Sequence, residues 1–276
     1  MQLDAPIGVF DSGLGGLTVV QALRSQLPEE DLVYLGDTAR VPYGTRSAST
    51  VIRYARSCAA RLRDFDIKLL VVACNTVSAV AIDVLRAELD IPVLGVIVPG
   101  AAAAVKASKT GRIAVIATTG TVKSGAYTRA VAGVSCRVEV FAKAAPLLVP
   151  LVEEGWLSGP IVDEVVLQYL KRFLPQSPDV VVLGCTHYPL LRTAISNCAC
   201  TLFGADAKVV DGSAATAAAV AECLDARSLR RTRKKSGSES PVLRLLVTDL
   251  PGEFQEQAGR FLGKEGTAAS VSCIDL

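Results

Sequence analysis

The stretch LLVVACNTVSAVAIDVLRAEL, residues 69–89, joins two hydrophobic patterns. A short unbroken apolar run, the length of one buried strand, ends in Cys74, Asn75 and Thr76, and apolar residues at helical spacing follow. A buried strand leading into a helix is the repeating unit of parallel α/β proteins. The stretch therefore predicts one such unit, with a cysteine where the strand ends.

The same alternation recurs along the chain. Continuous Val, Ile and Leu runs indicate strands buried on both faces, and the helices between them serve as crossover connections. The sequence predicts an α/β fold with doubly wound parallel sheets. The predicted strands are 7–11, 32–37, 68–74, 92–97, 112–118, 138–143, 180–185 and 208–211, and the predicted helices are 15–27, 49–65, 76–89, 124–133, 188–196 and 213–224.

Composition narrows the class of protein. The chain has 276 residues, and half of them are hydrophobic, which favours a large core. Its net charge is only +2, which argues against a nucleic-acid partner. No signal peptide is recognisable, and the apolar segments near residue 98 are too short to span a bilayer. Eight scattered cysteines then favour reduced thiols, and Cys198 and Cys200 lack a second pair for a structural metal. We expect a soluble cytoplasmic protein without a metal site.

Three segments invite a functional interpretation that their residues do not support strongly. Gly13 and Gly15 follow a strand, but Thr18 stands where a dinucleotide motif needs glycine, so a tight turn that can meet a small anion is favoured. The loop 41–47 could be an ordinary turn or a binding loop. The basic run 227–240 lacks aromatic residues and is interpreted as a solvated linker.

Polar residues stand at the ends of the predicted strands. In open α/β sheets, ligands bind outside the carboxyl ends of the strands, so these side chains should share one rim. The residues concerned are Asp11, Ser12, Asp37, Cys74, Asn75, Thr76, Thr118, Thr119, Cys185, Thr186, His187 and Asp211.

Two of these strand ends resemble each other. Residues 69–76 and 180–187 each carry an apolar run, a cysteine and a hydrogen-bonding residue, and His187 is the only histidine in the chain. A strand-end cysteine is usually a packed core residue. The similarity of the two segments is explained equally well by an internal duplication and by the general likeness of strand–helix units. Two thiols in matching settings could instead remove a proton from one face of a carbon and return one to the other. A thiolate base needs a pKa below the usual value of about 8.5.

At this point the motifs resemble a known family. The chain resembles glutamate racemases, of the aspartate/glutamate racemase superfamily, over nearly its whole length. The motifs, in order, are IGVFDSGLGGLTV (7–19), YLGDTARVPYGTRS (34–47), VVACNTVSA (71–79), VIATTGTVKSGAY (115–127), LVPLVEEG (148–155), VVLGCTHYPLL (181–191) and VVDGS (209–213), followed by PGEFQEQAGRFLG (251–263).

The resemblance implies roles for individual residues. It makes Cys74 and Cys185 the paired acid/base groups, with Asp11, His187 and a glutamate assisting proton transfer. Glu153 is favoured over its neighbour Glu154 for that assisting role. The implied substrate contacts are Asp11, Ser12, Tyr43, Gly44, Asn75, Thr76, Thr118, Thr119, Thr121, Thr186 and His187.

The resemblance also implies an architecture. Two similar α/β lobes would face each other with the active site between them. Residues 1–97 and 208–276 would form the lobe with Cys74, and residues 98–207 would form the lobe with Cys185. A homodimer is expected.

The implied reaction is interconversion of L- and D-glutamate without a cofactor or metal, which supplies D-glutamate for bacterial peptidoglycan. Only six residues precede Ile7, so we expect no activation by a peptidoglycan precursor. Two alternatives remain: a racemase for aspartate or another amino acid, and a non-catalytic amino-acid sensor.

Overall fold

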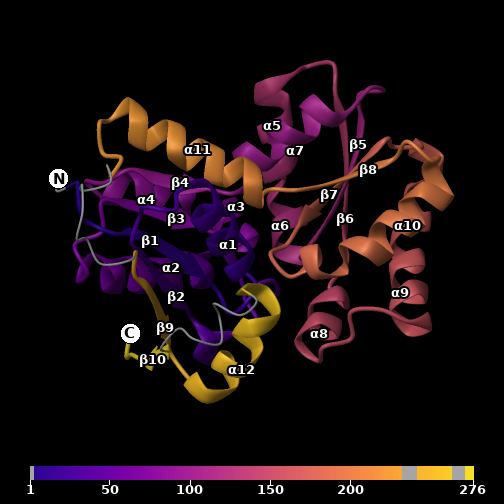
Figure 1. Cartoon of the computed structure of the whole chain (residues 1–276). Coiled ribbons are helices and arrows are strands. Elements are labelled where there is room, and N and C mark those ends of the chain that lie inside the picture. The colour runs from indigo at the N-terminus through magenta and orange to yellow at the C-terminus, as the bar shows by residue number, and fades with distance from the viewer. Residues whose placement is uncertain (1–2, 232–240, 263–270) are drawn as a thin grey trace. The chain divides into compact units, whose positions relative to one another are not determined.

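The chain folds into two compact units, each built on one parallel sheet (Figure 1). The structure is a computed structural model that describes residues 3–231, 241–262 and 271–276. Unit 1 comprises Met1–Val96 and Ser213–Leu276, and unit 2 comprises Ile97–Gly212. The chain thus leaves unit 1, forms unit 2 and returns.

Unit 1 contains a six-stranded sheet in the order β10-β9-β2-β1-β3-β4. All strand pairs in it are parallel, and β1 lies between β2 and β3. The late strands β9 and β10 extend the sheet beside β2 (Figure 1). The strands are β1 (Ile7–Asp11), β2 (Leu32–Gly36), β3 (Leu69–Val72), β4 (Val93–Gly95), β9 (Leu243–Val247) and β10 (Val271–Cys273).

Helices cover both faces of this sheet, as the continuous apolar strands require. On one face, Phe10, Leu35 and Val72 join a buried cluster with residues of α2, α3 and α4. On the other face, α1 packs against α11 and α12. The helices are α1 (Leu17–Gln26), α2 (Ala48–Arg63), α3 (Asn75–Val80), α4 (Ile82–Glu88), α11 (Ser213–Ala226) and α12 (Pro251–Leu262), with a short helical turn η1 (Thr38–Arg40) after β2.

Unit 2 contains a four-stranded parallel sheet in the order β6-β5-β7-β8. Helix α5 packs against α7, and α9 packs against α10. The strands are β5 (Arg112–Ala117), β6 (Glu139–Ala144), β7 (Val180–Gly184) and β8 (Lys208–Asp211). The helices are α5 (Ile97–Ala107), α6 (Thr119–Ser124), α7 (Ala126–Val134), α8 (Leu148–Glu153), α9 (Pro160–Leu170), η2 (Lys171–Gln176), η3 (Tyr188–Leu191) and α10 (Arg192–Phe203).

The two sheets share one strand order. Counted along the chain, β1–β4 and β5–β8 are each arranged second, first, third, fourth. The predicted fold class of two similar parallel α/β lobes is therefore confirmed. The boundary differs from the expected one: residues 208–211 form β8, which pairs with β7, so the return to unit 1 comes at Ser213 and not at residue 208.

Two predicted helices are divided in the structure. The segment 76–89 forms α3 and α4, which meet at Ala81, and the Ser78 hydroxyl in α3 donates to the carbonyl of Val72 at 2.9 Å. The segment 188–196 begins as the 3-10 turn η3, with Pro189 in its first turn, before α10 continues. In both cases the first turn stays close to the strand that precedes it.

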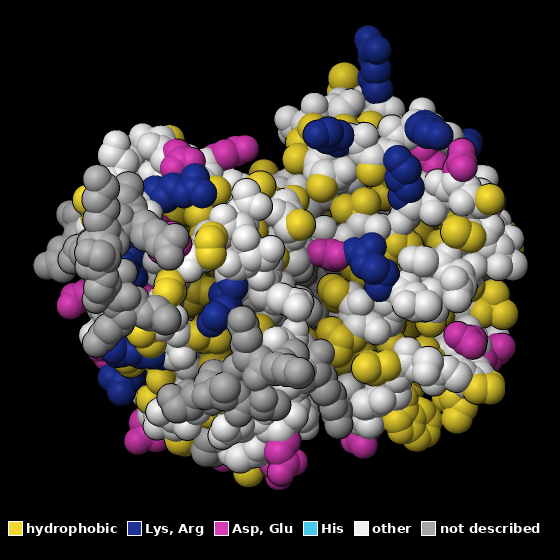
Figure 2. Space-filling model, viewed as in Figure 1, with side chains coloured by type: hydrophobic (Ala, Val, Ile, Leu, Met, Phe, Trp, Pro, Cys, Tyr) yellow, Lys and Arg dark blue, Asp and Glu magenta, His cyan; other side chains and the backbone are white. Residues whose placement is uncertain are grey.

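The surface carries mixed charge, in keeping with the small net charge of +2. On the face drawn in Figure 2, Lys and Arg are interspersed with Asp, Glu and apolar side chains. Among the described residues, no helix is long and apolar enough to cross a membrane. The part of the basic run 227–240 beyond Arg231 lies outside the described residues, as does Gly263 at the end of the tail motif.

Candidate active site

The candidate site residues of unit 1 lie where β1 and β3 end. These neighbouring strands pair Phe10 with Val72, so the register carried two residues further places Ser12 beside Cys74. The Cys74 thiol donates to the Ser12 hydroxyl at 3.4 Å. Since the strand order reverses at β1, this is the topological switch point at which open α/β sheets bind ligands.

Asp11 lies at the end of β1 and is completely buried. Its carboxylate accepts the main-chain N–H of Gly13 at 3.0 Å, which orients the side chain inside the turn that follows the strand. A buried carboxylate needs such partners, because desolvation otherwise disfavours its charge. The turn therefore holds Asp11 in a defined place within the thiol's own unit.

Cys74 occupies the N-cap position of α3 without a capping side-chain bond, and Asn75 and Thr76 begin the first turn. All three side chains are buried, with exposed fractions of 3–6%. The first amides of a helix have no partners within the helix, so this end can donate hydrogen bonds to an anion. The arrangement places a thiol and main-chain donors side by side.

The candidate site residues of unit 2 repeat this placement. Ala117 of β5 pairs with Gly184 of β7, so the next residues, Thr118 and Cys185, are neighbours at the strand ends. The Thr118 hydroxyl caps α6 by accepting the amide of Thr121 at 3.3 Å, and the two threonine hydroxyls lie 3.0 Å apart. Cys185 and Thr186 are buried, while Thr119 is partly buried. The thiol of each unit thus occupies the equivalent position.

His187 lies between a thiol and a carboxylate. Its Nδ1 is 3.9 Å from the Cys185 sulfur, and its Nε2 is 3.2 Å from Oε1 of Glu153, at the end of α8. Burial disfavours the charged imidazole, but Cys185 and Glu153 together outweigh burial and raise the pKa of His187 to about 10. Between the two glutamates left open by the sequence, this contact supports Glu153 over Glu154.

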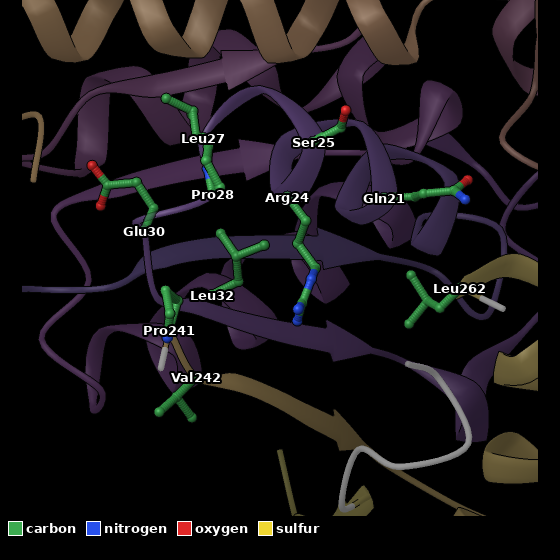
Figure 3. A pocket seen from close by; sticks show the side chains of 10 residues that line it. All are labelled: Gln21, Arg24, Ser25, Leu27, Pro28, Glu30, Leu32, Pro241, Val242 and Leu262. Atoms are coloured by element: carbon green, nitrogen blue, oxygen red, sulfur yellow. The ribbon is translucent and has the colours of Figure 1, made fainter. Parts of the chain in front are cut away.

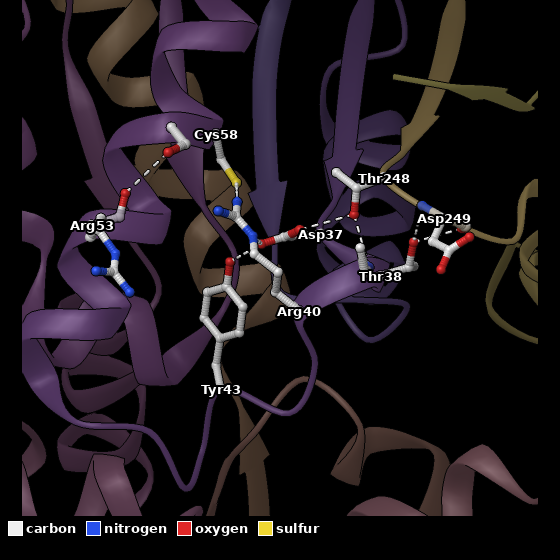
Figure 4. Close-up of polar contacts among 10 residues, drawn as sticks. Asp37, Thr38, Arg40, Tyr43, Arg53, Cys58, Thr248 and Asp249 are labelled. Carbon is white, nitrogen blue, oxygen red and sulfur yellow. Dashed lines mark hydrogen bonds and ion pairs between the residues drawn. The ribbon is translucent and has the colours of Figure 1, made fainter. Parts of the chain in front are cut away.

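Tyr43 points away from solvent into a polar cluster (Figure 4). Its hydroxyl donates to the Asp37 carboxylate, which also accepts Arg40 Nε at 2.6 Å and the Thr248 hydroxyl at 2.9 Å. Because the Tyr43 hydroxyl is bonded and its ring is buried, Tyr43 can contact a ligand only through its main chain. Gly44, which has no side chain, can contact a ligand in the same way. Burial raises the pKa of Cys58 in this cluster, which keeps that thiol neutral.

Three residues that sequence reasoning passed over lie close to the predicted ones. Tyr34 in β2 donates to the Gly13 carbonyl, and Thr248 after β9 joins the Asp37 cluster. The Tyr127 ring lies 3.1 Å from the place of a Cβ on Gly184, the residue before Cys185, and burial followed by the charges of Cys185 and Asp211 raises its pKa. A tyrosine inside a buried strand must find a partner for its hydroxyl, so the LVYLG pattern held a signal for Tyr34.

One hollow of about 550 Å³ lies elsewhere on unit 1 (Figure 3). Its lining includes Arg24 of α1, Leu32 at the start of β2, and Glu30 and Val242, which lie just before β2 and β9. It is therefore at the opposite end of the sheet from Cys74 and outside the strand-end rim.

The fold and these side chains define a class: parallel α/β proteins with one buried thiol at the switch point of each of two similar units. A family model described as Asp/Glu/Hydantoin racemase matches residues 10–220. The chain belongs to this family and is an enzyme of the isomerase class.

Proteins named glutamate racemase are similar to this chain over nearly its whole length. A glutamate racemase of Geobacter metallireducens is 46% identical over 267 residues, which cover 96% of each protein. A solved glutamate racemase isoform from Bacillus anthracis has a TM-score of 0.91 at 36% identity, covering 100% of this chain and 99% of that one. Another, from Francisella tularensis in complex with D-glutamate, has a TM-score of 0.89 at 36% identity, covering 99% and 98%. The resemblance to glutamate racemases is confirmed.

Proposed function

We propose that the protein interconverts L- and D-glutamate by two-base proton transfer at Cα, with Cys74 and Cys185 as the two bases. The observation that carries this proposal is the equivalent placement of two thiols, one at the switch point of each unit, in a chain whose relatives are named for this reaction. One catalytic thiol explains only one of these positions.

In the proposed reaction, the thiolate of one cysteine removes the Cα proton and becomes a thiol. The electron pair of the broken C–H bond stays on the substrate, delocalised into its α-carboxylate. The thiol of the other cysteine donates a proton to the opposite face and becomes a thiolate. The reverse reaction uses the same groups in the opposite order, so two bases of the same type suit a reaction whose substrate and product are mirror images.

The barrier lies in the carbanion, which hydrogen-bond donors fixed in advance can stabilise. The main-chain N–H groups after Cys74 and Cys185 would serve as these donors toward the α-carboxylate. The buried polar side chains beside them, Asn75 and Thr76 in unit 1 and Thr186 in unit 2, would orient the substrate.

His187 and Asp11 have assisting roles in this proposal. A protonated His187 beside Cys185 favours the thiolate and can supply the proton that the thiol later delivers, while Glu153 supports the imidazolium. Asp11 would assist Cys74 in unit 1 from the end of β1, the strand that pairs with β3.

The biological role follows from the resemblance. We infer that the enzyme supplies D-glutamate for peptidoglycan in a bacterial cytoplasm, and that it acts as a homodimer. Activity with glutamate but not aspartate would separate it from an aspartate racemase, so kcat/KM should be compared for the two acids.

Circular dichroism at one wavelength tests the activity. Starting from L-glutamate, the signal should decay to zero, and solvent deuterium should enter Cα from either enantiomer. Cys74→Ala and Cys185→Ala should each lower kcat by ~10²–10⁴-fold or more, since general acid–base catalysis contributes that much.

Matched controls come from thiols of the same units. Cys223→Ala in α11 and Cys198→Ala in α10 remove partly buried thiols away from the strand ends and should keep wild-type rates. A signal that stays constant with wild-type protein for both L-glutamate and L-aspartate would favour a non-catalytic sensor. Full activity of either Cys74→Ala or Cys185→Ala would contradict the two-base scheme.

A further inference from the structure

Tyr34 is a buried phenol that the proposed reaction does not use. It lies in the middle of β2, is fully buried, and donates its hydroxyl hydrogen to the carbonyl of Gly13 at 2.6 Å. Gly13 belongs to the turn after β1, the strand that pairs with β2 and places Val9 beside Tyr34. The hydroxyl therefore contacts the turn that carries the unit 1 part of the site.

Gly13 is held at both of its polar groups. Its carbonyl accepts the Tyr34 hydroxyl, and its N–H donates to the Asp11 carboxylate at 3.0 Å. A third bond, from the amide of Asp37 to the carbonyl of Asp11 at 3.1 Å, attaches the same turn to the end of β2. The phenol and the carboxylate thus share one residue, so moving the Gly13 carbonyl also moves the donor to Asp11.

Two glycines make room for this arrangement. A Cβ on Gly16 would lie 2.4 Å from Cβ of Asp11 and 3.1 Å from the Tyr34 ring. A Cβ on Gly36 would lie 2.5 Å from the Gly13 carbonyl oxygen and 3.2 Å from the same ring. Real side chains do not approach so closely, and the ring, the turn and Asp11 therefore fit together without spare volume.

The phenol remains a donor at working pH. Burial raises its pKa well above the ordinary value, and the charges of Asp11 and Cys74 raise it further. From the other side, Phe254 of α12 packs against the ring with 6.1 Å between centroids. The C-terminal helix thus supports the ring whose hydroxyl holds the turn.

We propose that Tyr34 is a positioning residue for racemisation: its hydroxyl fixes the Gly13 turn and thereby orients the Asp11 carboxylate beside Cys74. This inference rests on the proposed function. Tyr34 acts through Gly13 and does not itself contact the substrate.

The test is Tyr34→Phe, which removes one oxygen and keeps the ring. With Asp11 less well oriented, kcat should fall about tenfold, the loss expected for one hydrogen bond, while KM changes less than about threefold. Substrates deuterated at Cα supply a second readout. The primary isotope effect on kcat/KM should rise for the enantiomer that Cys74 deprotonates and fall for the other, because the Cys74 step becomes more limiting.

The matched control is Ser108→Ala. It deletes a hydroxyl that donates to Asp179 at 2.6 Å, at the amino end of the unit 2 strands, so it should lower the melting temperature without changing kcat or the isotope effects. If Tyr34→Phe behaves like this control, Tyr34 is merely structural and the inference is overturned.

Two further outcomes are decisive. If Tyr34→Phe does not fold, Phe254→Leu loosens the ring but keeps its hydroxyl, and an unchanged isotope effect in that variant overturns the inference. If wild-type protein racemises no glutamate, the proposed function fails and this inference fails with it. An active wild type beside an unaltered Tyr34→Phe overturns only the inference.

Discussion

His187 is the only histidine of the chain and lies between the Cys185 thiol and the Glu153 carboxylate. Its pKa of about 10 has a definite consequence for stability. Because the folded value lies above the ordinary 6.5, the charged imidazole stabilises the fold fully below pH ~6.5, and this contribution is lost as pH rises through about 10. Across neutral pH the residue is therefore a cation beside Cys185.

A single histidine permits a direct prediction about its partner. Glu153→Gln removes the negative charge 3.2 Å from Nε2, so the pKa of His187 should fall by about one unit, a moderate shift because the Glu153 side chain is 46% exposed. Proton NMR titration of the one imidazole measures the change without assignment of other histidines. The alkaline limb of the kcat profile should move to lower pH in the same variant.

The neighbouring glutamate is the control. Glu154→Gln removes the same charge at the C-cap of α8, where no contact with His187 is found among the described residues. It should leave both the titration and the pH profile unchanged. Equal shifts in the two variants would show that general electrostatics, and not the ion pair, sets the imidazole pKa.

At the scale of elements, the segment after β2 depends on a strand formed much later in the chain. The Thr248 hydroxyl, directly after β9, donates to Asp37 at 2.9 Å and accepts the amide of Ala39 at 2.9 Å. Thr38 and Asp249 add a reciprocal pair of hydrogen bonds. These contacts hold the segment that continues to Tyr43 (Figure 4). Gly44 follows Tyr43 directly.

Thr248→Val keeps the shape of the side chain but removes both bonds. Leaving Asp37 short of one donor and Ala39 short of an acceptor should lower the free energy of unfolding by about 1–3 kcal/mol. The KM for glutamate should rise a few-fold, because the loop with Tyr43 and Gly44 loosens. Urea unfolding and steady-state kinetics measure the two effects.

Thr201→Val is the comparison variant, since Thr201 is exposed and its hydroxyl bonds only within its own helix, α10, among the described contacts. Its unfolding free energy should stay within about 0.5 kcal/mol of wild type. A KM that does not change in Thr248→Val would separate the loop from substrate binding.

The sequence predicted where strands form better than it predicted which strands pair with each other. Runs such as 7–11 and 180–184 became strands as expected, because burial on both faces leaves an unbroken apolar pattern. The short strands β9 and β10 were not predicted, and β9 pairs with β2 across about 211 residues of sequence. Local pattern contains no information on such a pairing.

For the candidate site, too, the sequence indicated the residues themselves but not the residues that they contact. The cysteines and their polar neighbours were visible as interruptions of apolar runs, and the resemblance added Glu153. The partners of Asp37 and Gly13 come from distant strands, so only the folded chain reveals them.

At the scale of the whole molecule, a buried ion pair in the first segment of unit 1 contacts the segment that returns from unit 2. Lys68 and Glu30 lie 2.6 Å apart with side chains 0% and 2% exposed, and Lys68 also donates to the carbonyls of Leu3 and Leu229. The amide of Arg231 donates to Glu30. The pair thus connects the first segment of unit 1 to the segment that returns from unit 2.

Lys68→Met should lower the free energy of unfolding by about 3–5 kcal/mol, because it leaves Glu30 buried without its cation. The double variant Lys68→Met with Glu30→Leu should recover much of that loss, since it removes the unpaired charge as well. Denaturant unfolding at neutral pH measures all of them.

An exposed pair provides the contrast. Lys109 and Asp206 are 71% and 91% exposed, so Lys109→Met should change stability by less than about 1 kcal/mol. If Lys68→Met were equally harmless, the buried pair would not be what joins the two segments.

The return of the chain to unit 1 also bears on the order in which the protein is made. Synthesis runs from the N-terminus, and residues 97–212 contain every strand of unit 2 in one continuous piece. Unit 1, although its first strands leave the ribosome earlier, must wait for β9, α11 and α12. During synthesis the sheet of unit 1 is therefore incomplete, and the β2 edge is unpaired, at a time when all strands of unit 2 have been made. An exposed strand edge favours aggregation, so a chaperone would be most useful during this interval.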